Sequence, residues 1–196
     1  MKAIVASSHY QENLDWTVNC KYPTIVYSKT ISRSPNFIPF NKVQEVPAYL
    51  KYIIDNYKTL PEHSVFVHGH RSSNHQVGNI DDIINSIKFG DKKIINLNRP
   101  DWYQVINQDT NEWDKKYTWL SDNWKTLFKD TLPLPIKLGF WSSAQFAVHK
   151  DCILQYPMHF WSHLYKWCMK TTLENYVSAR IFEYTWYYIF SKRAMF

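Results

Sequence analysis

The chain has 196 residues, of which 45% are hydrophobic and 20% are charged, so it is long enough for one domain with a sizeable core. Its formal net charge of +6 indicates an anionic partner, but the basic residues are scattered, which argues against nucleic acid and favours a small phosphorylated ligand. The first apolar run is too short for a signal peptide, and no segment approaches the ~20 apolar residues of a membrane span. We therefore expect a soluble cytoplasmic protein whose three cysteines are reduced thiols.

The first predicted unit is a strand at residues 3–7, followed by a polar turn and a helix at residues 11–19. Hydroxyl and backbone N–H groups of such a turn can hold a nucleotide. The turn comprises Ser7, Ser8, His9 and Tyr10. It lacks the glycines of a dinucleotide fingerprint or a P-loop, which disfavours those two classes.

The next units are a strand at residues 24–28, a helix at 46–57 and a short buried strand at 65–67. His68, Gly69 and His70 follow that strand, and His75 lies in the polar loop beyond it. Ligands bind at the carboxyl ends of strands in open α/β sheets, so these imidazoles indicate a metal or phosphate site. The alternative is an ordinary strand end, at which one ring bonds to the main chain.

A helix at residues 80–88 and a strand at 93–97 complete an alternating order of strands and helices. This order predicts a single α/β domain over residues 1–196, with three layers and a mostly parallel central sheet. Residues 98–116 have no clear periodicity and are predicted to form a long functional loop. Further along, we expect a helix at 119–128, a small-residue turn from Gly139 into a strand at 145–148, and a capping box at 171–174 that opens the last helix, 173–190.

Glu183 is the only acidic residue on an otherwise aromatic face of the last helix. It either pairs with Arg180 one turn earlier or is displayed at a site where its pKa is raised. The aromatic excess of the whole chain, 17% with 9 Trp and 14 Tyr, has two readings as well. The rings either stack on flat ligands such as sugars and bases or simply fill the core.

Five motifs together resemble a known family over nearly the whole chain. They include Phe-x-His-Gly-His at residues 66–70 and Ala-Gln-Phe-Ala-Val at 144–148, and the others lie at 6–16, 45–61 and 182–190. The set resembles a domain-of-unknown-function family of small soluble proteins. It is also similar to the glycosyltransferase domains with which large DNA viruses, notably chloroviruses, decorate capsid glycans.

The resemblance implies a GT-A fold, a UDP-linked sugar as the donor, a divalent metal and a glycan or glycoprotein acceptor. Such folds place Asp-x-Asp at the end of a central strand, where this chain has His68 and His70 around Gly69. Imidazole binds Mn²⁺ acceptably but suits Mg²⁺ poorly. The two rings therefore either hold Mn²⁺ or donate hydrogen bonds to the diphosphate directly.

The resemblance assigns the remaining roles to three groups of residues. His70 and Glu183 are expected to be catalytic, with Glu183 or an Asp near the site as the base that takes the acceptor proton. The donor is expected to lie on Ser7, Ser8, His9, Tyr10 and Arg71, and the sugar or acceptor on Trp141, Ser142 and Gln145. Two alternatives stay open: a metal-dependent hydrolase built on the histidines, and a non-catalytic carbohydrate-binding module.

Overall fold

The computed structural model describes residues 2–107 and 117–191, apart from the side chains of residues 3, 4, 6 and 7. The central sheet has five strands in the order β2 (Thr24–Ser28), β1 (Ala3–His9), β3 (His63–His68), β7 (Phe146–His149) and β4 (Ile94–Asn96). β1 runs parallel to β2 and β3, whereas β7 runs antiparallel to both of its neighbours. The prediction that β1 and β3 are interior strands of a mostly parallel sheet is confirmed.

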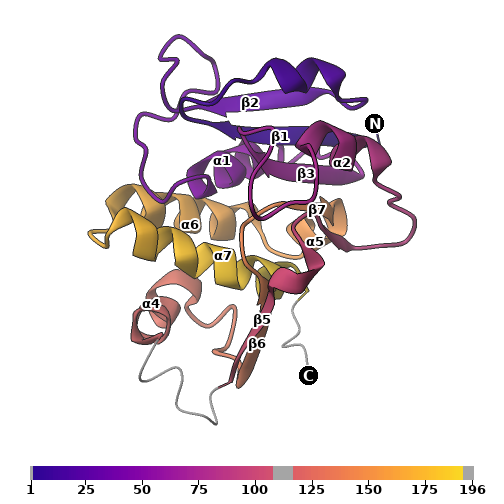
Figure 1. The fold of residues 1–196 in the computed structure, drawn as a ribbon. Helices are drawn as coiled ribbons and strands as arrows, with labels where there is room; N and C mark the ends of the chain where they lie inside the picture. The colour runs from indigo at the N-terminus through magenta and orange to yellow at the C-terminus, as the bar shows by residue number, and fades with distance from the viewer. Residues whose placement is uncertain (1, 108–116, 192–196) are drawn as a thin grey trace.

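Helices cover both faces of this sheet (Figure 1). One face packs against α1 (Val46–Asn56), α6 (Met158–Lys170) and α7 (Asn175–Ser191). The other face packs against the 3₁₀ helix η1 (Asp15–Asn19) and α2 (Ile80–Ser86). The chain is therefore a mixed α/β domain with its sheet between two helical layers, as the alternating sequence pattern predicts.

The aromatic residues form much of the larger core. Tyr49, Phe66, Phe146 and Trp186 are all buried, and their rings meet at centroid distances between 5.0 and 6.3 Å. Burying each large apolar side chain contributes about 1.5–3 kcal/mol. The hydroxyl of Tyr49 also donates to the carbonyl of Ala144 at 2.9 Å. This core thus supports the loop that enters β7.

A second, two-stranded antiparallel sheet lies beside α7 (Figure 1). It joins β5 (Tyr103–Asn107) to β6 (Lys137–Trp141), with α4 (Thr118–Phe128) between them in sequence. The described residues also form two further short helices, η2 (Pro100–Trp102) and α5 (Lys150–Leu154). None of the helices in the described part of the chain is both long and apolar enough to cross a bilayer.

Several sequence predictions need correction here. The predicted loop at residues 98–116 is wrong at its start, because η2 and β5 occupy residues 100–107, and its remainder, 108–116, lies outside the described residues. The predicted helix at residues 11–19 is only η1, and Gly139 lies inside β6 rather than in a turn. The capping box is not formed, because the Thr171 hydroxyl accepts from the N–H of Leu173 and α7 begins later, at Asn175.

Candidate active site at the carboxyl ends of β1 and β3

A cleft with two compartments opens at the carboxyl ends of β1 and β3. The smaller compartment has a volume of about 230 Å³, and its lining includes Ser8, Tyr10, Glu12, Lys29, Asn41 and His70. The larger has a volume of about 460 Å³, and its lining includes Asp101, Trp102, Gln104, Ser142, Arg180 and Glu183. Both compartments are also lined by Gln44, Glu45 and His68, so they meet at these three residues.

The position of the cleft follows from the strand order. The chain passes from β1 to β2 on one side and then crosses to β3 on the other side of β1. Open α/β sheets bind ligands at such a point, beyond the carboxyl ends of the strands. The register pairs Ser8 of β1 with His68 of β3, which places the two predicted binding segments side by side.

Gly69 allows these two strand ends to approach closely. A Cβ at this position would lie 2.8 Å from Glu12 Oε2 and 2.9 Å from the carbonyl oxygen of Ser8. The Glu12 carboxylate is itself fixed there by the backbone N–H groups of Tyr10 and Gln11, at 2.6 and 3.1 Å. The glycine of the His-Gly-His sequence is therefore explained by packing between the two loops.

Three imidazoles lie together at the end of β3. One ring nitrogen from each of His68, His70 and His75 lies within 4.8 Å of the others, and Nε2 of His70 is 3.0 Å from Nε2 of His75. Burial lowers the pKa of all three rings, to about 4 for His75, and the neighbouring rings lower it further at His68 and His75. The rings are therefore neutral at physiological pH.

The buried Glu45 and the half-buried Lys29 are charged residues on the wall of the same cleft. Glu45 Oε2 lies 3.9 Å from Nε2 of His68, and burial raises the pKa of Glu45 to about 7 although Lys29 lowers it. Burial lowers the pKa of Lys29 to about 8, and its ammonium donates to Asn41 Oδ1 at 3.1 Å and to the carbonyl of Gln44. Perturbed acids and bases of this kind gather at functional sites.

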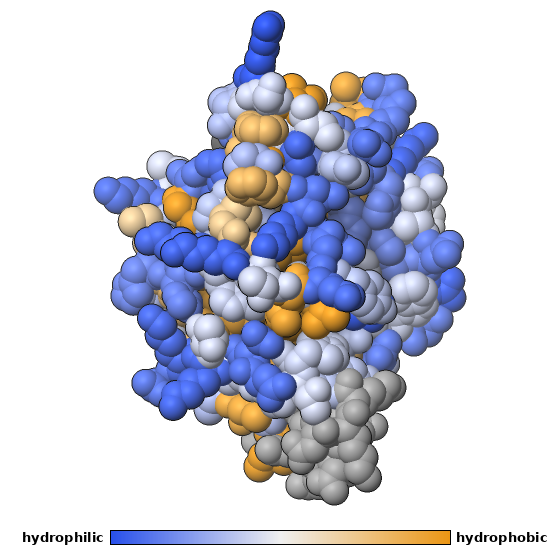
Figure 2. Space-filling view, turned by 90° about the vertical axis from the view of Figure 1, so that its left-hand side faces the viewer, coloured by the Kyte–Doolittle hydropathy of each residue, from blue (hydrophilic) through white to orange (hydrophobic). Residues whose placement is uncertain are grey.

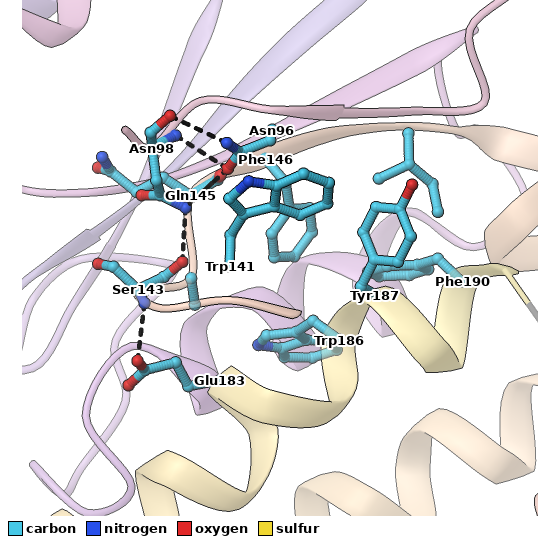
Figure 3. Close-up of a pocket in the computed structure, with 12 residues that line it drawn as sticks. Asn96, Asn98, Trp141, Ser143, Gln145, Phe146, Glu183, Trp186, Tyr187 and Phe190 are labelled. Atoms are coloured by element: carbon cyan, nitrogen blue, oxygen red, sulfur yellow. Dashed lines mark hydrogen bonds between the residues drawn. The ribbon is translucent and has the colours of Figure 1, made fainter. Parts of the chain in front are cut away.

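Glu183 reaches the cleft from α7, and Figure 3 shows its carboxylate accepting the backbone N–H of Ser143 at 2.7 Å. Burial raises the pKa of Glu183, although this hydrogen bond and Arg180 both lower it. Arg180 donates to the hydroxyl of Tyr184 instead of forming a close ion pair with Glu183. Of the two readings of Glu183, the structure therefore favours a carboxylate displayed at a site.

Backbone strain is concentrated beside the cleft. Val43, Gln44 and Ser143 have φ values of 56°, 47° and 75°, in the left-handed region that residues other than glycine rarely adopt. Each such residue costs about 1–3 kcal/mol, and such strain clusters at functional sites. The first two residues position Glu45 at the start of α1, and the third offers its N–H to Glu183.

The structure brings together six of the predicted site residues. Ser8 and Tyr10 line the smaller compartment with His70, while Ser142 and Glu183 line the larger one, and His68 lies between them. Ser7 belongs to β1, but its side chain lies outside the described structure.

Four predicted residues do not face the cleft. Arg71 forms a two-pronged ion pair with the buried Asp81, at 3.0 and 3.1 Å, and lines a separate hollow. The ring of His9 is buried against the hydroxyl of Ser28. Trp141 and Gln145 line a small cavity of about 20 Å³ behind the cleft (Figure 3).

Gln145 positions the histidines from that buried place. Its Oε1 accepts the backbone N–H of His68 at 3.1 Å, and its Nε2 lies 3.0 Å from Gln76 Oε1 and 3.4 Å from Nδ1 of His75. Because the main-chain N–H can only donate, this bond fixes which end of the amide faces His68. Gln145 therefore holds the loop that carries His75 against the end of β3.

Sequence reasoning missed Glu45, Lys29, Trp102 and Gln104 as cleft residues. Glu45 precedes a helix, where an acidic residue is favourable without any functional role. Lys29 looks like a surface lysine beyond a strand. Only their convergence in space, which depends on the long loop between β2 and α1, shows their importance.

That loop lies on the side of the molecule that Figure 2 turns toward the viewer, and much of the visible surface is hydrophilic with scattered apolar groups.

The donor atoms limit which metal the histidines could hold. Mg²⁺ prefers oxygen ligands, and among the residues of the cluster itself the available donors are three imidazole nitrogens. The site therefore does not fit Mg²⁺, and Mn²⁺ is the weakest of the first-row divalent ions on nitrogen ligands. Neither ion implied by the resemblance is a good match to these donors.

Comparison with known proteins gives one match. Residues 4–196 match a family described as "Protein of unknown function (DUF3431)". No curated protein and no solved structure matches the chain. Since the match extends over nearly the full sequence, the chain belongs to the DUF3431 family.

Proposed function

We propose that the protein is a glycosyltransferase that moves a sugar from a nucleoside diphosphate sugar to a hydroxyl group of a glycan or protein-linked acceptor. The observation that carries the proposal is the pair of compartments that meet at Glu45 and His68. Transfer between two bound substrates requires each to have its own site while the reacting atoms are held together. The resemblance to capsid-glycan transferases supplies the acceptor class and makes UDP the expected nucleotide.

The smaller compartment is the proposed donor site. It lies at the point of the sheet where ligands of α/β proteins bind, and Ser8 and Tyr10 offer hydroxyl groups to a nucleoside. Lys29 provides a positive charge for the diphosphate, because a pKa of about 8 leaves it mostly protonated at pH 7. The net charge of +6 agrees with an anionic substrate.

The larger compartment is the proposed acceptor site. Trp102 offers an aromatic surface, while Gln104, Ser142 and Arg180 offer polar groups around it. Sugars are bound by this combination, since their C–H faces pack on rings and their hydroxyls form hydrogen bonds. Gln104 donates to the Ser142 hydroxyl at 2.7 Å, which orders both side chains on this wall.

The chemistry assigned to the cleft is a direct displacement. Glu183 accepts the proton of the acceptor hydroxyl while that oxygen forms a bond to the anomeric carbon of the donor sugar. The bond from this carbon to the diphosphate oxygen breaks, and its electron pair leaves with the nucleoside diphosphate. Lys29 and the N–H of His70 stabilise the charge that develops on the leaving group.

Nucleotide binding is the first test. UDP, GDP and CMP at 10 mM should be titrated separately, with melting temperature and calorimetry as readouts. A nucleotide with a Kd of ~100 µM would stabilise the fold by about 2.7 kcal/mol at that concentration. Absence of any shift or heat with all three nucleotides would contradict the proposal.

A matched pair of lysine variants locates the donor site. Lys29→Met removes the charge that lines the donor compartment, and Lys58→Met removes an exposed charge outside it. We expect weaker nucleotide binding only in the first variant. Equal affinities in both variants would exclude Lys29 from diphosphate binding.

A metal-dependent hydrolase is the second candidate, and the closeness of the three histidines favours it. It predicts cleavage of a nucleotide sugar at full rate when water is the only acceptor. The transferase predicts that a sugar acceptor increases turnover and appears in the product. Glycan binding without any nucleotide effect would instead indicate a carbohydrate-binding module.

A further inference from the structure

The histidine cluster has features that hydrogen bonding within the protein does not explain. The ring centroids of His68, His70 and His75 lie 5.0–5.1 Å apart in all three pairs, and one nitrogen of each ring lies within 4.8 Å of the others. Nε2 of His68 is buried and has no hydrogen-bond partner among the described residues. A buried polar nitrogen without a partner is costly, and it indicates a ligand at this position.

The surroundings hold the rings in place from behind. Gln145 bonds to the backbone of His68 and approaches His75, as described above. Asn98 also lies beside His75, and its Oδ1, like Nε2 of His68, is buried and lacks a hydrogen-bond partner in the described structure. Hydrogen-bond acceptors behind an imidazole commonly orient it for metal binding, and Asn98 Oδ1 is an acceptor in such a position.

We propose that His68, His70 and His75 form a three-nitrogen site for a borderline transition metal ion, of which Zn²⁺ fits best. Zn–N bonds of 2.0–2.1 Å in a tetrahedron place the ligand nitrogens roughly 3.3–3.4 Å apart. His70 and His75 are already close to this separation at 3.0 Å, and the cluster as a whole must contract only modestly from its 4.8 Å limit. Three protein ligands leave the fourth position open, as in catalytic zinc sites.

Glu45 supplies the charge that such a site needs. A dication held by three neutral rings in a buried place requires a nearby anion, and Glu45 Oε2 lies 3.9 Å from Nε2 of His68. Lys29 and Glu183 are charged groups close to this acid, and Glu12 is close to His70. The inference does not depend on sugar transfer. It concerns metal binding by three histidines, with His75 as the third ligand, and this binding needs no nucleotide.

The test uses the protein without a polyhistidine tag, stripped with a chelator and dialysed. Zn²⁺ alone is titrated by calorimetry, and Co²⁺ is added separately as a spectroscopic probe. We expect one Zn²⁺ per chain, a higher melting temperature, and the strong visible absorption of four- or five-coordinate Co²⁺. A stoichiometry near zero or a spectrum of octahedral aqueous Co²⁺ would overturn the proposal.

Variants assign the ligands. His75→Ala should weaken Zn²⁺ binding by at least ~100-fold, since even residues behind the ligands are worth 10–100-fold. His159→Ala changes an exposed histidine outside the cluster and should leave the affinity unchanged. If His75→Ala does not fold, His70→Gln serves the same purpose. A folded variant that binds Zn²⁺ with wild-type affinity would contradict the assignment.

This experiment also separates the two proposals. Zn²⁺ binding with no nucleotide binding would keep the metal site and reject the transferase. Nucleotide binding that is unaffected by removal of metal with a chelator, together with no Zn²⁺ uptake, would keep the transferase and reject the metal site.

Discussion

Replacing Gly69 with alanine tests whether close packing of the two strand ends builds the cleft. Gly69 is not among the glycines with positive φ, so the substitution adds a steric conflict without a backbone one. The new Cβ would meet Glu12 Oε2 at 2.8 Å and the Ser8 carbonyl at 2.9 Å, and the second atom cannot swing away. Overpacking of this kind costs about 1–3 kcal/mol.

The unfolded chain offsets part of this cost. A change from glycine to alanine restricts the unfolded state and stabilises the fold by about 0.4–1 kcal/mol. The net loss in the free energy of unfolding is therefore between about 0 and 2.6 kcal/mol. For a chain of this size, the melting temperature should fall by up to roughly 10 °C.

Urea unfolding of four proteins measures the effect: wild type, Gly69→Ala, Glu12→Ala and the double variant. Glu12 contributes one of the two conflicting atoms, so Gly69→Ala should cost less in the Glu12→Ala background. Some cost should remain, because the Ser8 carbonyl is still in place. A Gly69→Ala protein more stable than wild type, or one whose loss of stability is the same in the Glu12→Ala background, would refute the packing argument.

Three further predictions concern single contacts. Glu183→Gln should lower transferase turnover by about 10²-fold or more, and the wild-type rate should fall as the pH drops through the raised pKa of Glu183, because the base must be ionised. The raised pKa also means that ionising Glu183 destabilises the wild-type fold, so the variant should become more stable relative to wild type as the pH rises. Parallel pH profiles of stability for the two proteins would contradict this. Arg71→Ala should lower stability without changing nucleotide affinity, since Arg71 pairs with Asp81. The loss of stability should diminish as the pH falls through the lowered pKa of Asp81. Weaker nucleotide binding by the variant would instead indicate that Arg71 belongs to the donor site. Tyr49→Phe should cost about 1–3 kcal/mol in urea unfolding, because the carbonyl of Ala144 loses its buried partner, and a change well below that range would mean that water or another donor replaces the hydroxyl.

The sheet and the larger helices were predictable because their signals are local. Residues 24–28 and 46–57 carry patterns that the structure reproduces almost to the residue as β2 and α1. β5 was missed because it is stabilised by pairing with β6. Tyr103 of β5 pairs with Trp141 of β6, which lies 38 positions later in the chain. No local pattern reports such a pairing.

The site was predictable in position but not in composition. The sequence places His68 and His70 at a strand end, and the topology of the sheet places that strand end beside β1. Glu45 and Lys29 could not be found in this way, because their role depends on burial and on each other. Arg71 was assigned to the donor site on charge and proximity in sequence, but its partner is Asp81 on α2.

The position of β7 in the sheet also constrains how the protein is made. β4 has no bond to β3 and joins the sheet only through β7, which follows it after about 50 residues. At ~5–20 residues per second, a ribosome needs roughly 3–10 s to supply that strand. During this interval β3 remains an open edge, and the wall of the cleft that carries Ser143 and Glu183 does not yet exist. The histidines of the nascent chain are therefore synthesised before Glu183, and the cleft is completed only during the last third of synthesis.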